Sequence, residues 1–367
     1  MDNKRYLKNI LLFIIFFLLA TAITNYMVDP EGIYSKKNSN SQIYINKLLE
    51  SDYGLLDSGN PWNDREFKKA LAEYPINYDC AIVGSSHLQP ISSIRQNKSL
   101  VSICPSMKNL YVSGGTLEDY LAMSNIILKN KDFLPKTIVF GIDPWSLNFG
   151  RDKRWVLYAH DYFEMRDKLL GKPSSKNDSL NLSKDLLTNL FNLQYLKLSL
   201  IRIFEDKSGT ITPNPVEKFN YQIGLKFPVI LKDGSGVYSS QFIEDHKDRL
   251  KTLSGKHSYK IFKDSYYQEY AIKIFEKLVQ HIINSQVNVV FVLTPYRHKV
   301  LSNTKQPITK ALNIIEGKVH EIAKKYKTQV IGSYNPYSIG CLEDEFFDNM
   351  HPMDKCLMKL ENKSISY

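Results

Sequence analysis

The chain has 367 residues, of which 43% are hydrophobic and 23% charged, a balance typical of a folded protein with a full core. This composition excludes collagen-like and low-complexity proteins, and we find no internal repeat. Lysine and arginine outnumber aspartate and glutamate by 48 to 38, which gives a formal charge of +10. The excess is scattered lysine without a dense arginine cluster. We therefore expect a solvated surface and no nucleic-acid binding, with some preference for anionic lipid or polysaccharide nearby.

The N-terminal region predicts a membrane anchor. Residues 9–28 carry no charge, and a run of about 20 such residues suits a helix that crosses a bilayer. Three basic residues lie within positions 1–8 and Asp29 follows the run, so the positive-inside bias places the tail in the cytoplasm and the body outside. A cleaved signal peptide is the alternative, with Ala20–Ala22 as its cleavage site. The uncharged run continues past that site, which favours a retained, single-pass anchor in the cytoplasmic membrane.

Two later segments do not follow a regular pattern of strands and helices. Residues 29–77 are polar and rich in turns with weak helical character, and we interpret them as a lead-in that wraps onto the domain. Residues 150–265, with aromatic, polar and Gly/Pro-containing stretches, are interpreted as a large insertion. The predicted domain covers residues 78–367 and includes this insertion.

Short apolar runs predict a buried parallel sheet, because strands covered on both faces are apolar throughout. The runs lie at residues 78–83, 100–104, 137–142, 287–293 and 329–331. Helices are predicted over residues 116–129, 268–286 and 307–326, and Thr116 is the expected N-cap of the first, with Asp119 at its third position. Strands that alternate with helices predict an α/β fold, with helices on both faces of a parallel sheet.

Polar residues follow several of these strands. Ligands of open α/β sheets bind beyond the carboxyl ends of the strands, so the residues located there are the first candidates for a site. Ser86 follows the first strand, Gly114 lies downstream of the second and Asp143 follows the third. Tyr296 and Arg297 follow the strongest strand, and we expect them either to bind substrate or to lie in a solvated loop.

Ser86, His351 and Asp348 have the chemistry of a nucleophilic triad. A serine hydroxyl attacks well only when a base takes its proton, and a neutral imidazole does this near neutral pH. The imidazole needs an acceptor at its other nitrogen, and Asp348 lies three residues before His351. Gly114 has no Cβ, so its backbone N–H can approach a developing oxyanion closely.

The order of these residues resembles the SGNH/GDSL hydrolase family. Gly84-Ser85-Ser86 stands where the family has Gly-Asp-Ser, and Val112-Ser113-Gly114 resembles the second family block, whose glycine donates to the oxyanion hole. The Asp-x-x-His sequence at Asp348 and His351 resembles the last block. The resemblance implies a flavodoxin-like, three-layer parallel α/β fold with Ser86 as the nucleophile.

Asp143 departs from the family pattern. The third block of the family is Gly-x-Asn-Asp, whose asparagine donates to the oxyanion, and Asp143 occupies the asparagine position in Gly141-Ile142-Asp143-Pro144. An ionised carboxylate cannot donate a hydrogen bond and repels an oxyanion. Asp143 is therefore either protonated by burial, a ligand of substrate hydroxyls or a structural residue, and we favour the last two.

The single anchor and the long insertion make the chain similar to membrane-anchored envelope members of this family. These include the DltD-like proteins and the relatives that O-acetylate alginate and peptidoglycan. The resemblance covers roughly residues 78–145 and 287–352. It implies a serine esterase or O-acyltransferase that acts outside the cytoplasm on acyl, chiefly acetyl, esters of an envelope polysaccharide. It also implies a membrane-embedded acyltransferase as partner.

Other functions remain open from the sequence. Hydrolysis and transfer use the same three residues, so the sequence does not choose between water and a sugar hydroxyl as acceptor. A non-catalytic, glycan-binding or assembly component that keeps the fold is the alternative from another class. A lipase or thioesterase is less favoured, because the insertion has no obvious apolar helix to bind a long acyl chain.

Cysteines and metal motifs complete the sequence predictions. The HxH, HExxH and CxxC patterns are absent, so we expect neither a metal nor a cofactor. Cys341 and Cys356 flank the Asp-x-x-His sequence and could be bridged in an oxidising compartment. Cys80 and Cys104 lie in apolar runs and are expected to be buried free thiols.

Two residues with aromatic rings lie next to the predicted site in the sequence. His87 follows the nucleophile directly, and we expect it to pack or bind substrate rather than act as the base. Trp145 follows Asp143 closely and is expected in the core rather than stacked on a sugar.

Overall fold

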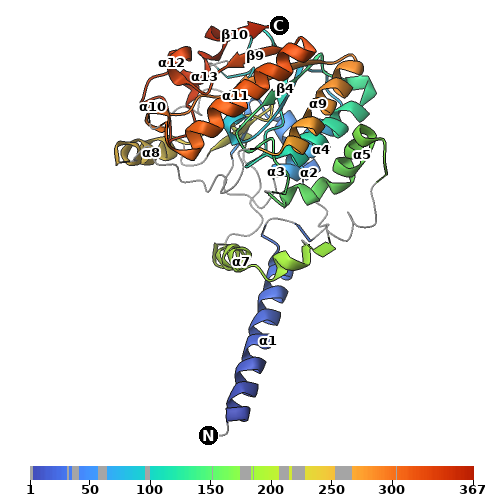
Figure 1. Cartoon of the computed structure of the whole chain (residues 1–367), viewed down its shortest axis with the longest axis vertical. Coiled ribbons are helices and arrows are strands. Elements are labelled where there is room, and N and C mark those ends of the chain that lie inside the picture. The colour runs from blue at the N-terminus through green and yellow to red at the C-terminus, as the bar shows by residue number, and fades with distance from the viewer. Residues whose placement is uncertain are drawn as a thin grey trace. The chain divides into compact units, whose positions relative to one another are not determined.

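A computed structural model describes most of the chain in two compact units (Figure 1). The described residues are 3–30, 33–34, 41–56, 64–95, 100–150, 152–173, 183–184, 186–205, 215–216, 228–252, 267–302 and 304–367. The smaller unit groups Met1–Asn40, Asn60–Asn63 and Lys172–Thr212, and the larger unit groups Ser41–Gly59, Asp64–Gly171 and Pro213–Tyr367.

A six-stranded sheet lies at the centre of the larger unit. Its strands are β2 (Cys80–Val83), β3 (Met107–Asn109), β4 (Thr137–Gly141), β8 (Asn288–Leu293), β9 (Gln329–Gly332) and β10 (Ser364–Ser366). The spatial order is β10-β9-β8-β4-β2-β3, with β10 antiparallel to β9 and every other pair parallel. The parallel strands therefore follow the doubly wound order 2-1-3-4-5, which reverses between β2 and β4. The predicted mixed α/β class is confirmed.

Helices cover both faces of this sheet, because successive strand residues point to opposite sides. Long helices cover one face: α4 (Leu117–Lys129), α9 (Glu269–Asn284) and α11 (Pro307–Tyr326). There Tyr120 and Phe275 pack on Phe140 of β4, with ring centroids 5.6 and 5.5 Å away. Short elements cover the other face: η1 (Ser86–Leu88), α12 (Pro336–Ile339), α13 (Asp354–Leu357) and η4 (Leu360–Asn362).

The helix predicted from Thr116 is confirmed, but the second predicted strand is wrong. Thr116 N–H donates to the Asp119 carboxylate at 2.8 Å, which completes the N-cap of α4. Residues 100–104 form a turn, closed by Cys104 N–H donating to Leu100 O at 2.7 Å. The strand begins later, at Met107-Lys108-Asn109. Its polar side chains are buried by donating to backbone carbonyls, so an apolar pattern does not reveal it.

Both pairs of cysteines form disulfides. The Cys341–Cys356 bridge, which the sequence left open, is present. The prediction of free thiols at Cys80 and Cys104 is wrong. Cys80 begins β2, which pairs with β3, so the turn that leads into β3 brings Cys104 within 5.4 Å between Cα atoms.

The lead-in and the insertion together form a second sheet in the larger unit. Its order is β5-β1-β6-β7, and all its pairs are antiparallel. The strands are β1 (Gly54–Leu56), β5 (Pro215–Val216), β6 (Val229–Leu231) and β7 (Gly236–Val237). Strand β1 belongs to the lead-in and the others to the insertion. Gly236 N–H donates to Gln89 O at 2.8 Å, which places this sheet beside the turn that follows Ser86.

The remaining elements of the larger unit are short segments and surface helices. They are α2 (Ser41–Glu50), α3 (Asp64–Glu73), η2 (Lys131–Phe133), η3 (Arg154–Tyr158), α5 (Ala159–Leu170), α8 (Ser240–Thr252) and α10 (His298–Leu301).

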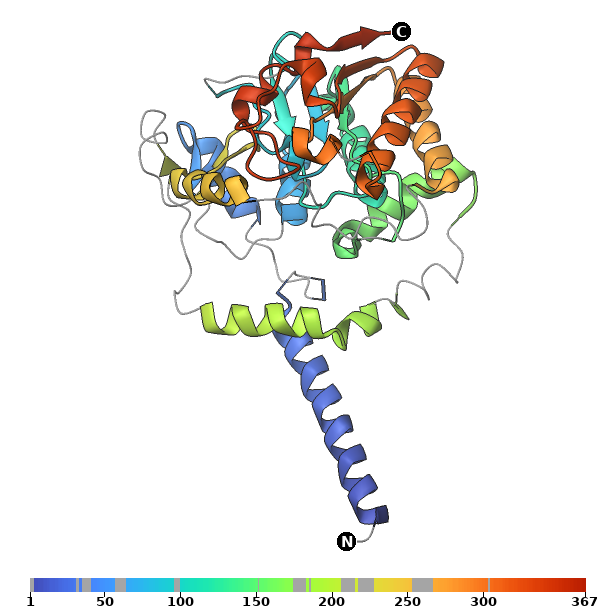
Figure 2. The same ribbon diagram turned by 60° about the vertical axis from the view of Figure 1, so that its left-hand side comes forward.

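The smaller unit contains α1 (Asn3–Val28) and α7 (Leu193–Glu205). Within the described chain, α1 is the one helix long and apolar enough to cross a membrane, over Lys4–Val28. Helix α7 comes from the insertion and crosses the C-terminal end of α1 (Figure 2). Side-chain hydrogen bonds join α1 to α7 and to the residues before it: Ser199 Oγ donates to Asn25 Oδ1 at 3.0 Å, and Asn25 Nδ2 donates to Leu190 O at 2.7 Å.

Candidate active site

Ser86 lies at the start of a one-turn helix that directly follows β2. The preceding Gly84 permits this tight turn, because a Cβ there would lie 2.5 Å from Leu88 Cδ1 and 3.1 Å from Gly141 O. Ser85 caps the turn by accepting a hydrogen bond from His87 N–H at 3.2 Å. Ser85 and His87 are buried, whereas Ser86 is half-buried. The turn therefore presents the Ser86 hydroxyl at the carboxyl end of β2.

The three predicted triad residues form one chain of hydrogen bonds. Ser86 Oγ lies 3.0 Å from His351 Nε2, and His351 Nδ1 lies 2.9 Å from Asp348 Oδ2. An imidazole with its proton on Nδ1 donates to the carboxylate and leaves Nε2 free to accept the serine proton. The geometry is thus that of a nucleophile, a base and an orienting acceptor.

Asp348 is held as an ionised acceptor. Its Oδ1 accepts backbone hydrogen bonds from Met350 at 2.7 Å and His351 at 2.8 Å. Burial acts to raise the pKa of Asp348. The His351 contact and the two backbone donors outweigh it, so the pKa lies well below its usual range. The carboxylate is therefore charged at neutral pH and can stabilise an imidazolium at His351.

The loop that carries Asp348 and His351 is fixed at several points. Phe347 N–H donates to His351 O at 3.0 Å, and the Cys341–Cys356 disulfide closes the surrounding segment. The Phe347 ring packs against Tyr238, with centroids 4.2 Å apart. The second sheet and the residues after it therefore help to position the base.

A second Asp–His pair lies beside the triad. His87 and Asp143 are 1% and 2% exposed, and His87 Nδ1 lies 2.9 Å from Asp143 Oδ1 and 3.1 Å from Thr294 Oγ1. The His87 ring contacts the His351 ring edge-on, with centroids 4.6 Å apart. Asp143 therefore faces a buried histidine, and of the alternatives considered for it this placement favours a structural role.

Gly114 lies in the turn beside the nucleophile, but its neighbour makes the closer approach. Gly114 has φ +64°, a conformation that glycine adopts readily, and is half-buried. A Cβ at Gly115 would lie 2.8 Å from Gly84 O, and Val112 N–H donates to that oxygen at 3.0 Å. Gly115, which the sequence analysis missed, therefore lets this turn contact the backbone before Ser86. The Gly-Gly pair was the available signal.

Tyr296 and Arg297 are both buried, so the solvated loop considered for them is wrong. They follow the central strand β8, where the neighbouring strands and loops cover the chain on both sides. The Tyr296 ring packs on His87, with centroids 5.5 Å apart. Arg297 Nε lies 2.7 Å from Glu343 Oε1, and the backbone N–H of Arg297 donates to Asn349 O at 3.1 Å. Arg297 thus holds the segment next to Asp348.

Trp145 is buried, as expected of a core aromatic, and its ring contacts His87 with centroids 5.4 Å apart. Among the described residues, the cluster with metal-ligand types is Cys341, Glu345 and Cys356. Its two sulfurs are joined in the disulfide, and Glu345 pairs with Lys359 at 2.7 Å. This cluster therefore offers no thiolate for a metal.

The candidate site lies where parallel strand order reverses. Ser86 follows β2 and Asp143 follows β4, the two strands on either side of the reversal, which is where doubly wound sheets bind ligands. The arrangement supplies a nucleophile, a base and a charged acceptor for attack on an electrophilic carbonyl or similar centre. No protein-family model matches the chain, and no curated protein sequence is significantly similar to it.

Proposed function

We propose that this protein is a membrane-anchored serine esterase or O-acyltransferase that acts outside the cytoplasm on acyl esters of an envelope polysaccharide. The observation that carries the proposal is the continuous chain of hydrogen bonds from Ser86 through His351 to Asp348. The SGNH-type order of the sequence blocks supports the same reaction class.

The reaction has two halves. Ser86 Oγ attacks the acyl carbonyl carbon while its proton moves to His351 Nε2. The tetrahedral intermediate then expels the alcohol oxygen, which takes the proton from His351 and leaves an acyl ester on Ser86. In the second half, water or a sugar hydroxyl gives its proton to His351 and attacks the ester. The product acid or new sugar ester leaves as Ser86 recovers its proton.

Charge near His351 supports proton transfer. An imidazolium forms at His351 in each half, and the ionised Asp348 stabilises it. Asp143, across the His87 ring, supplies a second carboxylate beside the same imidazole. Because Asp143 is engaged with His87, the oxyanion would be stabilised by backbone N–H groups, those of Ser86 and Gly114.

Helix α1 and the two disulfides support the proposed location. A helix of this length and apolarity would anchor the chain, and the basic residues before it favour a cytoplasmic tail. Disulfides persist in oxidising compartments outside the cytoplasm. The polysaccharide substrate and a membrane-embedded acyltransferase partner rest on the family resemblance.

Turnover of p-nitrophenyl acetate by the full-length protein in detergent tests the proposal. We expect Ser86→Ala to reduce p-nitrophenol release by a factor of about a thousand or more. Ser113→Ala is the control, because its exposed side chain lies in the neighbouring turn. A folded wild type that neither releases p-nitrophenol nor retains acetyl would favour the glycan-binding component instead. Adding sugar oligomers and following acetyl transfer against acetate release separates transferase from hydrolase.

A further inference from the structure

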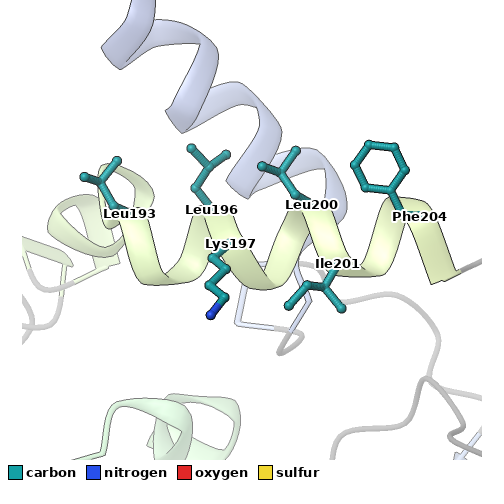
Figure 3. A pocket seen from close by; sticks show the side chains of 6 residues that line it. All are labelled: Leu193, Leu196, Lys197, Leu200, Ile201 and Phe204. Atoms are coloured by element: carbon teal, nitrogen blue, oxygen red, sulfur yellow. The ribbon is translucent and has the colours of Figure 1, made fainter.

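Helix α7 lies in the insertion and presents an uncovered apolar side, so the expectation that the insertion holds no apolar helix is wrong. Leu193, Leu196, Leu200 and Phe204 project together from one side of the helix, while Lys197 and Ile201 point away from them (Figure 3). Leu193 is 61% and Phe204 71% exposed, although large apolar side chains are ordinarily covered in a folded protein. The described parts of the chain therefore leave this side of α7 largely uncovered, with only Leu196 half-buried.

A different side of α7 is fixed to the end of α1 by polar side chains. Tyr195 and Ser199 are buried there, and the Tyr195 hydroxyl donates to Asp29 Oδ1 at 2.7 Å. Ser199 donates to Asn25 Oδ1 at 3.0 Å. These contacts fix how α7 is rotated against α1 within the smaller unit. As a result, the apolar side chains point toward the side on which α1 extends away from α7 (Figure 3).

The length and position of α7 suit a bilayer surface. Its 13 residues span about 20 Å along the helix axis, too short to cross a membrane. Asn25 and Asp29, which it contacts, lie at the end of the candidate span and so at the level of the bilayer surface if α1 crosses it. A helix there with apolar side chains toward the acyl chains and a lysine toward the headgroups has the pattern of an interfacial helix.

We propose that α7 lies in the outer surface of the bilayer, with Leu193, Leu196, Leu200 and Phe204 among the lipid acyl chains. The proposal rests on the proposed function only in taking α1 as a membrane-spanning helix, and it is independent of the catalytic chemistry. The partner is lipid rather than protein, because these side chains point the same way as α1 extends, and α1 exposes large apolar side chains along its length. Lys197 would reach anionic headgroups.

Depth-dependent quenching in liposomes tests this proposal. The full-length protein would carry a single added cysteine, Leu200→Cys, labelled with the environment-sensitive dye NBD. In the described chain the native cysteines are all disulfide-bonded, so the added thiol is the reactive one. The matched control is Leu198→Cys, an exposed leucine about 160° around the same helix. Phe13→Cys reports separately on the span.

In vesicles of phosphatidylcholine and phosphatidylglycerol with brominated acyl chains, we expect strong quenching at positions 13 and 200. Quenching at position 198 should be several-fold weaker. Equal quenching at positions 198 and 200, with position 13 still quenched, would overturn the proposal and point to a protein partner on α7. It would leave the membrane-spanning role of α1 intact. Absence of quenching at position 13 would overturn the membrane anchor itself and the present inference with it.

Discussion

Two Asp–His pairs share the candidate site, and they have different surroundings. His351 is half-buried and reaches Ser86, whereas His87 is buried between Asp143, Thr294 and the His351 ring. An ionised Asp143 would add negative charge near the position where the proposed reaction forms an imidazolium at His351. Beside its structural contact with His87, Asp143 would then act on the proposed reaction through electrostatics, without donating to the oxyanion.

Substituting Asp143→Asn tests this role. The amide keeps the shape of the side chain but removes its charge, so we expect acylation of Ser86 to slow about tenfold, equivalent to about 1.4 kcal/mol. The rate of labelling by a fluorophosphonate measures it. Asp79→Asn is the control, because Asp79 pairs with Lys136 just before β2, at the opposite end of that strand. A faster rate in Asp143→Asn would instead show that position 143 faces the oxyanion.

Outside the candidate active site, Lys68 is also a buried ionisable residue. Its ammonium donates to Asn109 O at 2.9 Å and to Gly234 O, and lies 4.0 Å from the centroid of the Tyr111 ring. Burial lowers the pKa of Lys68 to about 7. In the unfolded chain the pKa of a lysine is about 10.4. Between about pH 7 and 10.4 the unfolded state therefore binds more protons than the folded state. The stability contributed by Lys68 therefore rises with pH in that window.

The Lys68→Met variant should lose this pH dependence. We expect the free energy of unfolding of the wild type, relative to the variant, to rise by up to about 1.4 kcal/mol per pH unit between about pH 7 and 9. Denaturant titrations at several pH values in that range measure the difference. Parallel curves for the two proteins would contradict a lowered lysine pKa.

The sequence predicted the triad better than its surroundings. Short motifs in the sequence indicated the triad residues Ser86, Asp348 and His351. The structure brings these three side chains within hydrogen-bond distance of one another. The His87–Asp143 pair and the close approach of Gly115 depend on neighbouring strands meeting in space. No local pattern contains that information.

At the level of elements, the sequence predicted the apolar strands and the amphipathic helices correctly. It did not predict the polar strand β3. Strands β4 and β8 are apolar because helices cover both their faces. Strand β3 is polar because Lys108 and Asn109 satisfy backbone carbonyls of the lead-in and of the turn after Ser86. Burial of a polar strand depends on partners distant in sequence, so periodicity alone does not reveal it.

The two disulfides should differ in their effect on the site. Loop closure by each is worth about 3 kcal/mol of stability, since the bridged residues are 24 and 15 positions apart. We expect the double variants Cys80→Ala/Cys104→Ala and Cys341→Ala/Cys356→Ala to lose similar stability in thermal unfolding. Only the second should slow fluorophosphonate labelling while still folded, because its loop carries Asp348 and His351. Equal labelling rates in both would contradict a positioning role for that loop.

At the scale of the whole molecule, segments that are far apart in the sequence belong to the same sheet or the same compact unit. The lead-in supplies β1 to a sheet whose other strands come from the insertion, more than a hundred residues later. Part of the same insertion, Lys172–Thr212, groups with α1 instead. Uncharged and apolar runs identified α1 and strands β2, β4, β8 and β9 of the main sheet. They could not reveal this division, because the polar contacts of Asn25 and Asp29 with α7 leave no periodic signal.

The central claim is that Ser86 is the nucleophile of an acyl-transfer reaction. Reaction of the full-length protein with a fluorophosphonate, followed by intact mass measurement and peptide mapping, tests it most directly. We predict one adduct per chain, located on Ser86, that is absent from Ser86→Ala and strongly reduced in His351→Ala. A folded, unmodified wild type, or an adduct that persists on another residue in Ser86→Ala, would contradict the account.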